Sequence, residues 1–330
     1  MTAAAGDIRV GLVGYGTIGR RLVSAVRDLP GFRMAGIAVR RPLPGLQRLA
    51  ADGVAVHLCV EALLDEVDLV LDCTPRGTGA KLDPLYRAAG VRVIYQGGEP
   101  TGLADTDYCF GFGFDAARRS RSVRIPSCNT TALVRLATLL GGPERIQRLR
   151  AVIIRSATDP DKAFKGSPNS LSAAAGRSHH AEDVRRFLPQ LDIVTLAATA
   201  PVNCGHLASI FIEMRTAASA ADIMERLAQS PRIISLSGGT GALSDMRRPG
   251  LSRHRQDCPS VMIWPEAISV LGREVALFAG IHMESIVVPE TLDAMQAMTA
   301  STDHAAVAMA LSDRTLALGS NSSPQESAVA

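Results

Sequence analysis

Near its N-terminus the chain reads IRVGLVGYGTIG over residues 8–19. The apolar run before the glycines predicts a strand, and residues 20–28, where apolar side chains recur at helical spacing, predict a helix after them. Residues 32–39 read as a second strand and close a βαβ unit. The alternation continues as strand, helix and strand in residues 67–73, 82–89 and 91–95. This pattern predicts an α/β, Rossmann-type domain with a parallel sheet covered on both faces.

The three glycines of the first stretch predict a dinucleotide site. Gly14 permits the tight turn after the strand, Gly16 lets the backbone approach a pyrophosphate, and Gly19 lets helix and strand pack closely. The N–H groups at the start of the helix then face the phosphates. A glycine-rich turn in another kind of α/β protein is the alternative, but the strand before the glycines and the helix after them favour the dinucleotide site.

Two arginines at the end of the second predicted strand bear on the choice of cofactor. A site for NAD usually has an acidic residue there, which binds the ribose 2′-hydroxyl. This chain instead has Arg40 and Arg41. Guanidinium groups suit a 2′-phosphate because they can bind it bidentately. We therefore expect NADP as the preferred cofactor, with NAD as the alternative, and a solvated basic loop as the alternative role for the arginines.

The second half of the chain follows a different pattern. After about residue 147, strand-like segments follow one another with one helix, residues 219–228, between them. These segments are residues 149–155, 193–200, 206–214, 233–236, 261–263, 267–270 and 275–281. They predict an α+β catalytic domain with a mainly antiparallel sheet. We expect the chain to divide into a dinucleotide domain (1–127), a catalytic domain (128–284), C-terminal helices that pack back on the first domain (285–319) and a frayed tail (320–330).

One cysteine lies where a thiol can act as a nucleophile. Cys128 precedes residues 132–140, which have helical spacing, and the Asn and Thr residues directly after it are good capping types. A helix N-terminus favours the thiolate, so we expect the thiol pKa to be lowered. A thiolate can attack an aldehyde, and the thiohemiacetal can then pass a hydride to a nicotinamide and leave a thioester. A buried capping cysteine is the alternative.

The composition excludes several classes of function. The chain has 330 residues, enough for about two domains, and 47% of them are apolar. Its net charge of +3 is too small for a nucleic-acid footprint, and no apolar run is long enough for a membrane helix. The six cysteines are scattered without metal-ligand spacing. We expect a soluble, cytoplasmic protein without a metal, a nucleic-acid partner or a membrane partner.

Longer motifs resemble those of the archaeal-type (type II) glyceraldehyde-3-phosphate dehydrogenase family, and SCNTT and QGGE in this order are quite specific to it. The matching segments are GYGTIG (14–19), DCTPRGTGAK (72–81), YQGGEP (95–100), SCNTT (127–131), RSATDP (155–160), SHH (178–180), HLASI (206–210), HMESIVVPE (282–290) and DRTLALG (313–319). The resemblance implies an NAD(P)-dependent oxidoreductase of glycolysis. It would convert glyceraldehyde 3-phosphate and inorganic phosphate to 1,3-bisphosphoglycerate, usually as a homotetramer.

By position, the resemblance assigns roles to particular residues. Cys128 corresponds to the nucleophile and His206 to the acid/base that takes the hemiacetal proton. The residues that correspond to substrate contacts are Ser127, Asn129, Thr130, Arg155, His179 and His180. The cofactor contacts, besides the three glycines and two arginines named above, are Thr17, Ile18, Gly97 and Gly98. The alternatives are a hydrogen-bonded core histidine for His206, a polar loop for the histidine pair and an ion pair for Arg155. The other histidines, His57, His254, His282 and His304, are expected to be structural or exposed.

Three positions depart from the family pattern. The family usually has a second arginine at Ser156, often a second histidine at Ala208 and typically a glutamine at Met283. Lost polar contacts can weaken binding or accompany a different substrate, as in a divergent bacterial paralogue. The alternatives are therefore the same chemistry on another phosphorylated aldehyde or an amino-acid semialdehyde, and a nucleotide-binding protein without catalysis.

Overall fold

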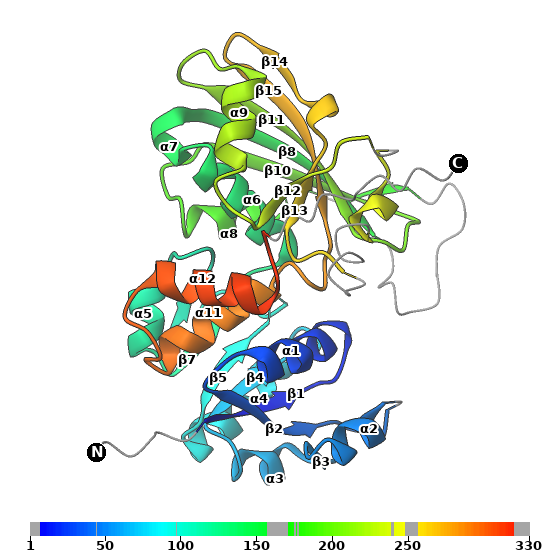
Figure 1. Cartoon of the computed structure of the whole chain (residues 1–330), viewed down its shortest axis with the longest axis vertical. Coiled ribbons are helices and arrows are strands. Elements are labelled where there is room, and N and C mark those ends of the chain that lie inside the picture. The colour runs from blue at the N-terminus through cyan, green and yellow to red at the C-terminus, as the bar shows by residue number, and fades with distance from the viewer. Residues whose placement is uncertain are drawn as a thin grey trace, which may run out of the picture.

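A computed structural model describes residues 7–43, 45–96, 98–156, 171–174, 176, 178–238, 241–247 and 257–319. Their strands form two separate sheets, one toward each end of the elongated molecule (Figure 1). Helices α11 (Val288–Met298) and α12 (Ala305–Thr315) lie between the sheets. Within these ranges, no helix has the length and apolar character needed to cross a membrane.

The first sheet is parallel throughout and has the Rossmann-type order. Its described strands, in spatial order, are β3 (Ala55–His57), β2 (Phe32–Ala38), β1 (Ile8–Val13), β4 (Leu69–Asp72), β5 (Arg92–Tyr95), β7 (Ser122–Arg124) and β6 (Thr106–Asp107). The helices of this half are α1 (Thr17–Asp28), α2 (Leu46–Ala51), α3 (Val60–Leu64), α4 (Thr78–Ala89) and α5 (Phe114–Arg119). The strand order reverses at β1, which lies between β2 and β4. Ligands of open parallel sheets bind beyond the strand ends at such a reversal, so the fold places a site after β1 and β4.

The predicted parallel sheet is confirmed, and β1 begins and ends where the sequence predicts. The short elements α2, β3, α3, β6, α5 and β7 were not predicted. Each has two to six residues. This is less than two turns of a helix and too short for a clear alternation of apolar and polar residues in a strand, so periodicity gave too little signal.

The second sheet is mixed and mainly antiparallel, as predicted. Its described strands follow the order β12 (Ile233–Ser235), β13 (Val261–Ile263), β15 (Glu274–Ile281), β11 (His206–Met214), β8 (Ile146–Ser156), β10 (Ile193–Ala200) and β9 (Ser172–Ala173), while β14 (Ser269–Leu271) pairs with β15. Only the pairs β8–β10 and β12–β13 are parallel among these strands. The helices of this half are α6 (Cys128–Leu139), α7 (Gly142–Arg145), α8 (His180–Arg185) and α9 (Ala220–Leu227).

Two details of this half differ from the prediction. The expected single helix is present as α9, but α8 also lies between strands, with only six residues. The strand expected over 267–270 begins later, as Ser269–Leu271, because Pro265–Ala267 forms a 3₁₀ turn. A proline has no N–H to donate to a neighbouring strand, which accounts for the later start.

Helix α11 brings the chain back to the first sheet. It contacts α1, α5 and β5, and the Gln96 side chain after β5 donates to the Thr291 hydroxyl over 3.0 Å. Tyr108 donates to the Asp293 carboxylate on the same helix over 3.0 Å. We propose on this basis that the chain is organised as the segments 1–127, 128–284 and 285–319, with the last belonging to the first domain. The tail 320–330 lies outside the described residues.

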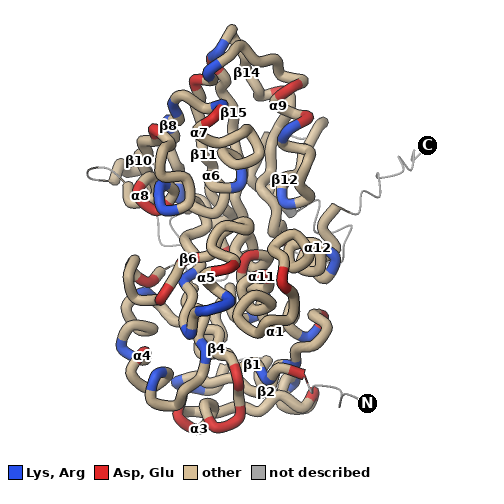
Figure 2. Tube along the Cα trace, turned by 90° about the vertical axis from the view of Figure 1, so that its left-hand side faces the viewer, with Lys and Arg blue, Asp and Glu red and all other residues tan. Residues whose placement is uncertain are grey.

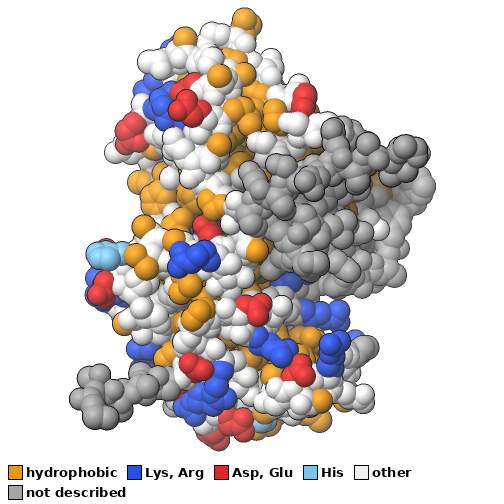
Figure 3. Space-filling view, viewed as in Figure 1, with side chains coloured by type: hydrophobic (Ala, Val, Ile, Leu, Met, Phe, Trp, Pro, Cys, Tyr) orange, Lys and Arg blue, Asp and Glu red, His pale blue; other side chains and the backbone are white. Residues whose placement is uncertain are grey.

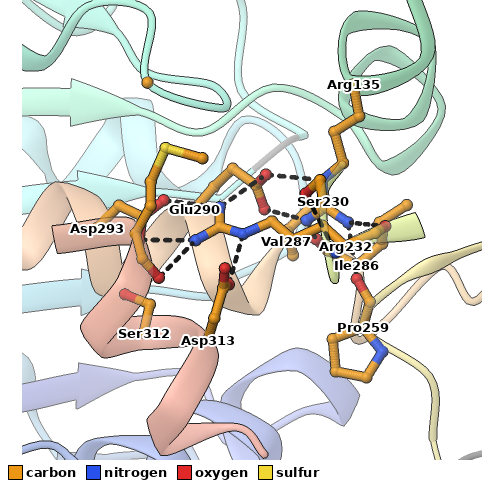
Figure 4. A network of polar contacts seen from close by, with 12 residues as sticks. Arg135, Ser230, Arg232, Pro259, Ile286, Val287, Glu290, Asp293, Ser312 and Asp313 are labelled. Carbon is orange, nitrogen blue, oxygen red and sulfur yellow. Dashed lines mark hydrogen bonds and ion pairs between the residues drawn. The ribbon is translucent and has the colours of Figure 1, made fainter. Parts of the chain in front are cut away.

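A buried charge network joins the two halves at α11 (Figure 4). Arg135 on α6 binds Glu290 with Nε to Oε1 at 2.9 Å and Nη2 to Oε2 at 2.5 Å. Arg232, just before β12, binds Asp293 over 2.7 Å and Asp313 over 2.7 Å. The side chains of both arginines and of Glu290 have no exposed surface. Figure 2 shows the acidic positions of α11 at the centre of the molecule, between the sheets.

Loss of one charge should destabilise this network strongly. Breaking a buried ion pair costs about 3–5 kcal/mol, because the remaining charge stays buried without its partner. We therefore expect Glu290→Gln to lower the free energy of unfolding, measured with urea, by about that amount. Asp52→Asn is the control, since Asp52 pairs with Arg27 at the surface, where a pair contributes less than about 1 kcal/mol. Equal losses in the two variants would contradict this interpretation.

Candidate active site

A cleft of about 500 Å³ lies at the end of the first sheet, where the two domains meet. From the first domain it is lined by residues that follow β4 and β5, namely Arg76, Gly98, Glu99, Pro100 and Thr101. Ser127, at the boundary, also lines it, and from the second domain come Asn129, Arg155, His179, His180 and His206. The cleft therefore brings together all the predicted substrate contacts except Thr130, which is fully buried beneath it in α6.

The predicted nucleophile and acid/base lie side by side. Cys128 is the first residue of α6, as predicted, and the Ser127 hydroxyl caps the helix by accepting from the Thr130 backbone N–H. His206 is the first residue of β11, where it pairs in register with Ile281 of β15. The Cys128 Sγ and His206 Nδ1 atoms are 3.8 Å apart. The same ring nitrogen lies 3.0 Å from the Asn129 side-chain oxygen, which orients the imidazole.

The expected lowering of the thiol pKa is wrong in this structure. Burial raises the pKa of Cys128 to about 12; the backbone N–H groups of Asn129 and Cys128 lower it less, and the nearby carboxylate of Glu284 raises it. Desolvation of the thiolate therefore outweighs the favourable helix N-terminus. Burial also lowers the pKa of His206 to about 4, helped by the charges of Arg155 and His282. At neutral pH the pair is a neutral thiol beside a neutral imidazole.

A second group of polar side chains adjoins this pair. The His180 Nδ1 atom lies 3.1 Å from the Ser127 hydroxyl, and its Nε2 lies 3.4 Å from the Asn129 side-chain nitrogen. Burial lowers the pKa of His180 to about 3, so its ring is neutral at neutral pH. The exposed His179 ring packs against it, with 4.2 Å between ring centroids. Four arginines bring positive charge to the cleft, namely Arg76, Arg124, Arg155 and Arg186. Arg124 and Arg186 pair with Asp107, whereas the Arg155 Nε is buried without a hydrogen-bond partner.

The glycine turn fits a dinucleotide. Gly14 has φ +94°, and a Cβ there would lie 3.0 Å from the Cys73 backbone, so the turn needs glycine. A Cβ on Gly19 would collide with the Gly14 carbonyl oxygen, whereas one on Gly16 would meet nothing within 4 Å. The open side of Gly16 faces the start of α1, which contains Thr17 and Ile18 and has no side-chain cap. The turn therefore leaves room and N–H donors for a pyrophosphate.

The remaining predicted cofactor contacts lie at the edges of this region. Arg40 and Arg41 are exposed directly after β2, at the strand end where a 2′-phosphate would lie. Gly98 lines the cleft. Gly97 lies outside the described residues.

Sequence reasoning missed several charged residues of this region. Those that line the cleft are Arg76, Glu99, Arg124, Glu182, Asp183 and Arg186, and the charge of the buried Glu284 acts on the Cys128 thiol. Arg76, Glu99 and Glu284 lie inside motifs that matched the family, so for these three the signal was the motif and not the residue type. His282, expected to be structural or exposed, is buried. At the departure Ser156, the hydroxyl donates to the Val202 carbonyl over 2.6 Å.

A Rossmann-type domain joined across a cleft to a cysteine–histidine pair defines a nicotinamide-dependent oxidoreductase with a cysteine nucleophile. Residues 127–249 match the family model of the glyceraldehyde 3-phosphate dehydrogenase C-terminal domain. The glyceraldehyde-3-phosphate dehydrogenase of Aeropyrum pernix is 36% identical over 320 residues, covering 89% of this chain and 93% of the relative. Those of Hyperthermus butylicus and Sulfolobus acidocaldarius are each 33% identical, over 94% and 88% of this chain. The chain therefore belongs to the glyceraldehyde-3-phosphate dehydrogenase family, in its archaeal type.

Two of the buried histidines, His180 and His206, should make the fold sensitive to acid. Their folded pKa values of about 4 (His206) and 3 (His180) lie below the ordinary 6.5, so the unfolded chain binds protons first as the pH falls. Stability is therefore retained above pH 6.5 and is lost below it, by about 1.4 kcal/mol per pH unit for each ring until its folded pKa is reached. We expect the unfolding free energy to fall less between pH 7 and pH 5 in His206→Asn or His180→Asn than in the unchanged protein.

Urea titrations at the two pH values measure this difference. His304→Asn is the control, because His304 is exposed and its replacement should leave the pH dependence unchanged. The same pH dependence in all variants would show that neither buried ring is responsible.

Proposed function

We propose that the chain catalyses the NAD(P)-dependent, phosphorylating oxidation of glyceraldehyde 3-phosphate to 1,3-bisphosphoglycerate. The observation that carries this proposal is the 3.8 Å approach of the Cys128 sulfur to His206, which lines the cleft between the two domains. The relatives at 33–36% identity carry the name of this activity. A phosphorylated aldehyde and inorganic phosphate are the partners that the reaction requires.

In the first step the Cys128 sulfur attacks the aldehyde carbon. The thiol proton passes through the His206 imidazole to the carbonyl oxygen, and the product is a thiohemiacetal on Cys128. The Asn129 side-chain oxygen accepts from the Nδ1–H of His206 and so fixes the ring, which leaves Nε2 as the nitrogen that takes up and returns protons. Arg155, together with the polar groups of His179, His180 and Ser127, holds the substrate phosphate.

In the second step His206 takes the hydroxyl proton while the carbon-bound hydrogen leaves with its electron pair. The nicotinamide supplies the hydride acceptor, and Cys128 is left as a thioester. Inorganic phosphate then attacks the thioester carbon, the carbon–sulfur bond breaks, and the acyl phosphate departs. The sulfur retains the bonding electrons and recovers a proton from His206, so the enzyme returns to its starting state.

NADP is the cofactor that we propose to be preferred. The exposed Arg40 and Arg41 directly after β2 support this choice, since they can bind a 2′-phosphate bidentately. We also propose a cytoplasmic location, which cell fractionation would check. None of the six cysteines takes part in a disulfide, which is usual for proteins of a reducing compartment.

Cofactor reduction by the purified protein tests the proposal. With glyceraldehyde 3-phosphate we expect phosphate-dependent reduction that is faster with NADP than with NAD. Cys128→Ser should abolish it because the thioester cannot form, and His206→Asn should lower kcat by about 10²- to 10⁴-fold. Replacing Arg40 and Arg41 by Gln should lower the ratio of NADP to NAD activity.

The controls separate this proposal from its rivals. Reduction that needs no phosphate, or that survives in Cys128→Ser, would contradict it. Cofactor binding without turnover of this aldehyde would indicate another substrate for the same cysteine chemistry.

We propose that the protein is a homo-oligomer, with the tetramer as the expected size, and that the outer face of the second sheet takes part in the contact. Leu196, Val152 and Phe278 lie in one row across β10, β8 and β15, and they are 51%, 37% and 41% exposed. Phe211, one row away on β11, is 55% exposed. Figure 3 shows hydrophobic side chains among polar ones at the surface of this half. Exposed apolar residues that adjoin in this way mark a contact surface, and a second copy of the chain fits it.

Light scattering after size-exclusion chromatography tests this contact. We expect Phe211→Lys to reduce the molecular mass of the assembly, because the charge would be buried at the contact. Leu271→Lys is the matched control, since Leu271 is 78% exposed on β14, away from the row. An unchanged mass in Phe211→Lys would place the contact elsewhere.

A further inference from the structure

Polar atoms without partners gather directly after β15. His282, Glu284 and Ser285 are 3%, 2% and 0% exposed. The His282 Nδ1, both carboxylate oxygens of Glu284 and the Ser285 hydroxyl are buried without a hydrogen-bond partner. A buried polar group without a partner is unfavourable by several kcal/mol, and a carboxylate more so. Such a cluster indicates that a ligand or substrate completes it.

The cluster lies between the reacting pair and the dinucleotide domain. The last residue of β15, Ile281, pairs in register with His206, and the cluster begins with the next residue. Helix α6, which begins with Cys128, packs against β15. After the cluster the chain enters α11, which contacts α1, the helix that begins at the glycine turn. The chain therefore connects this cluster to the Cys128–His206 pair at one end and to the dinucleotide domain at the other.

The neighbouring histidine reaches one side of the carboxylate. The His282 Nδ1 and Glu284 Oε2 atoms are 2.9 Å apart and form an ion pair when the ring is protonated, whereas Glu284 Oε1 is buried without a hydrogen-bond partner. The charge of Glu284 also acts on the Cys128 thiol, whose pKa it helps to raise after burial, the largest cause. Arg155 also acts on this thiol and on its partner His206, and His282 acts on His206.

The reaction brings one cation close to this carboxylate. An oxidised nicotinamide ring carries a positive charge and must lie against the carbon bound to Cys128 when it accepts the hydride. After hydride transfer the ring is neutral. A buried carboxylate near the ring therefore interacts differently with the two forms of the cofactor, because charges in a poorly hydrated site are weakly screened.

We propose that Glu284 is a positioning residue whose buried carboxylate is the electrostatic partner of the oxidised nicotinamide ring, so that the protein binds the oxidised cofactor in preference to the reduced one. This inference rests on the proposed function for the location of the ring. The cation compensates Glu284 when it binds, and the thiol of Cys128 then ionises more readily.

Direct binding titrations of oxidised and reduced NADP to Glu284→Gln test the proposal. We expect the affinity for the oxidised form to fall about tenfold, the effect of one pKa unit of charge interaction, while the affinity for the reduced form changes little. Glu284→Asp, which keeps the charge, should retain most of the preference. Glu182→Gln is the matched control, because this exposed carboxylate on α8 is at the same cleft, and its loss should leave the preference unchanged. Equal losses of affinity for both forms, or no loss, would overturn the proposal.

A second readout follows the thiol itself. Without cofactor, alkylation of Cys128 by iodoacetamide should reach its half-maximal rate at a lower pH in Glu284→Gln than in the unchanged protein or in Glu182→Gln. A purely structural role for Glu284 would leave this pH profile unmoved, and that result would overturn the proposal. Circular dichroism establishes that each variant is folded. Neither measurement uses an aldehyde, so a failed activity assay would count against the proposed function and not against this inference.

Discussion

The buried contact between Arg135 and Glu290 holds the molecule together at the point where both domains meet. Glu290 belongs to a helix that packs on the dinucleotide domain, while Arg135 belongs to the helix that begins with Cys128. Arg135 also donates to the carbonyls of Pro259 and Ile286, over 2.8 and 2.7 Å. A charge pair with no exposed surface contributes most when all its donors are satisfied, as they are here. The position of the sulfur relative to the cofactor turn therefore depends on this contact.

Neither Cys128 nor His206 carries a charge at neutral pH in this arrangement. A thiol with a raised pKa and an imidazole with a lowered pKa are both neutral, since burial disfavours either charged form. A neutral thiol is a poor nucleophile, so the resting site is protected from stray alkylation and oxidation. Reactivity must come from whatever brings a compensating charge into the cleft. The same burial that suppresses the thiol thus makes it respond to its ligands.

The sequence predicted the long elements and the turn, because their signals are local. The glycines at 14, 16 and 19 each have a steric reason for being glycine, which the structure bears out at Gly14 and Gly19. The position of Cys128 at a helix start was equally local. The pKa of its thiol could not be predicted from local sequence. Desolvation depends on what packs around the helix, and Glu284, whose charge also raises this pKa, is 156 residues away in the chain. The contact between Cys128 and His206 likewise followed from the family motifs and not from any pattern in the residues themselves.

Cys128 and Arg135 lie about two turns apart on one helix, so the sulfur is carried by an element that the core holds on several sides. Two arginines that line the cleft are placed otherwise: Arg76 follows a strand of the other domain, and Arg155 is close to the end of β8. Under the proposed function, the sulfur that forms the bond and the groups that would select the substrate therefore lie in separate parts of the chain. A lineage can alter the residues around the cleft, as at Ser156, and keep the helix that contains Cys128 unchanged. Descendants of one such enzyme can acquire new aldehydes without having to reinvent the chemistry.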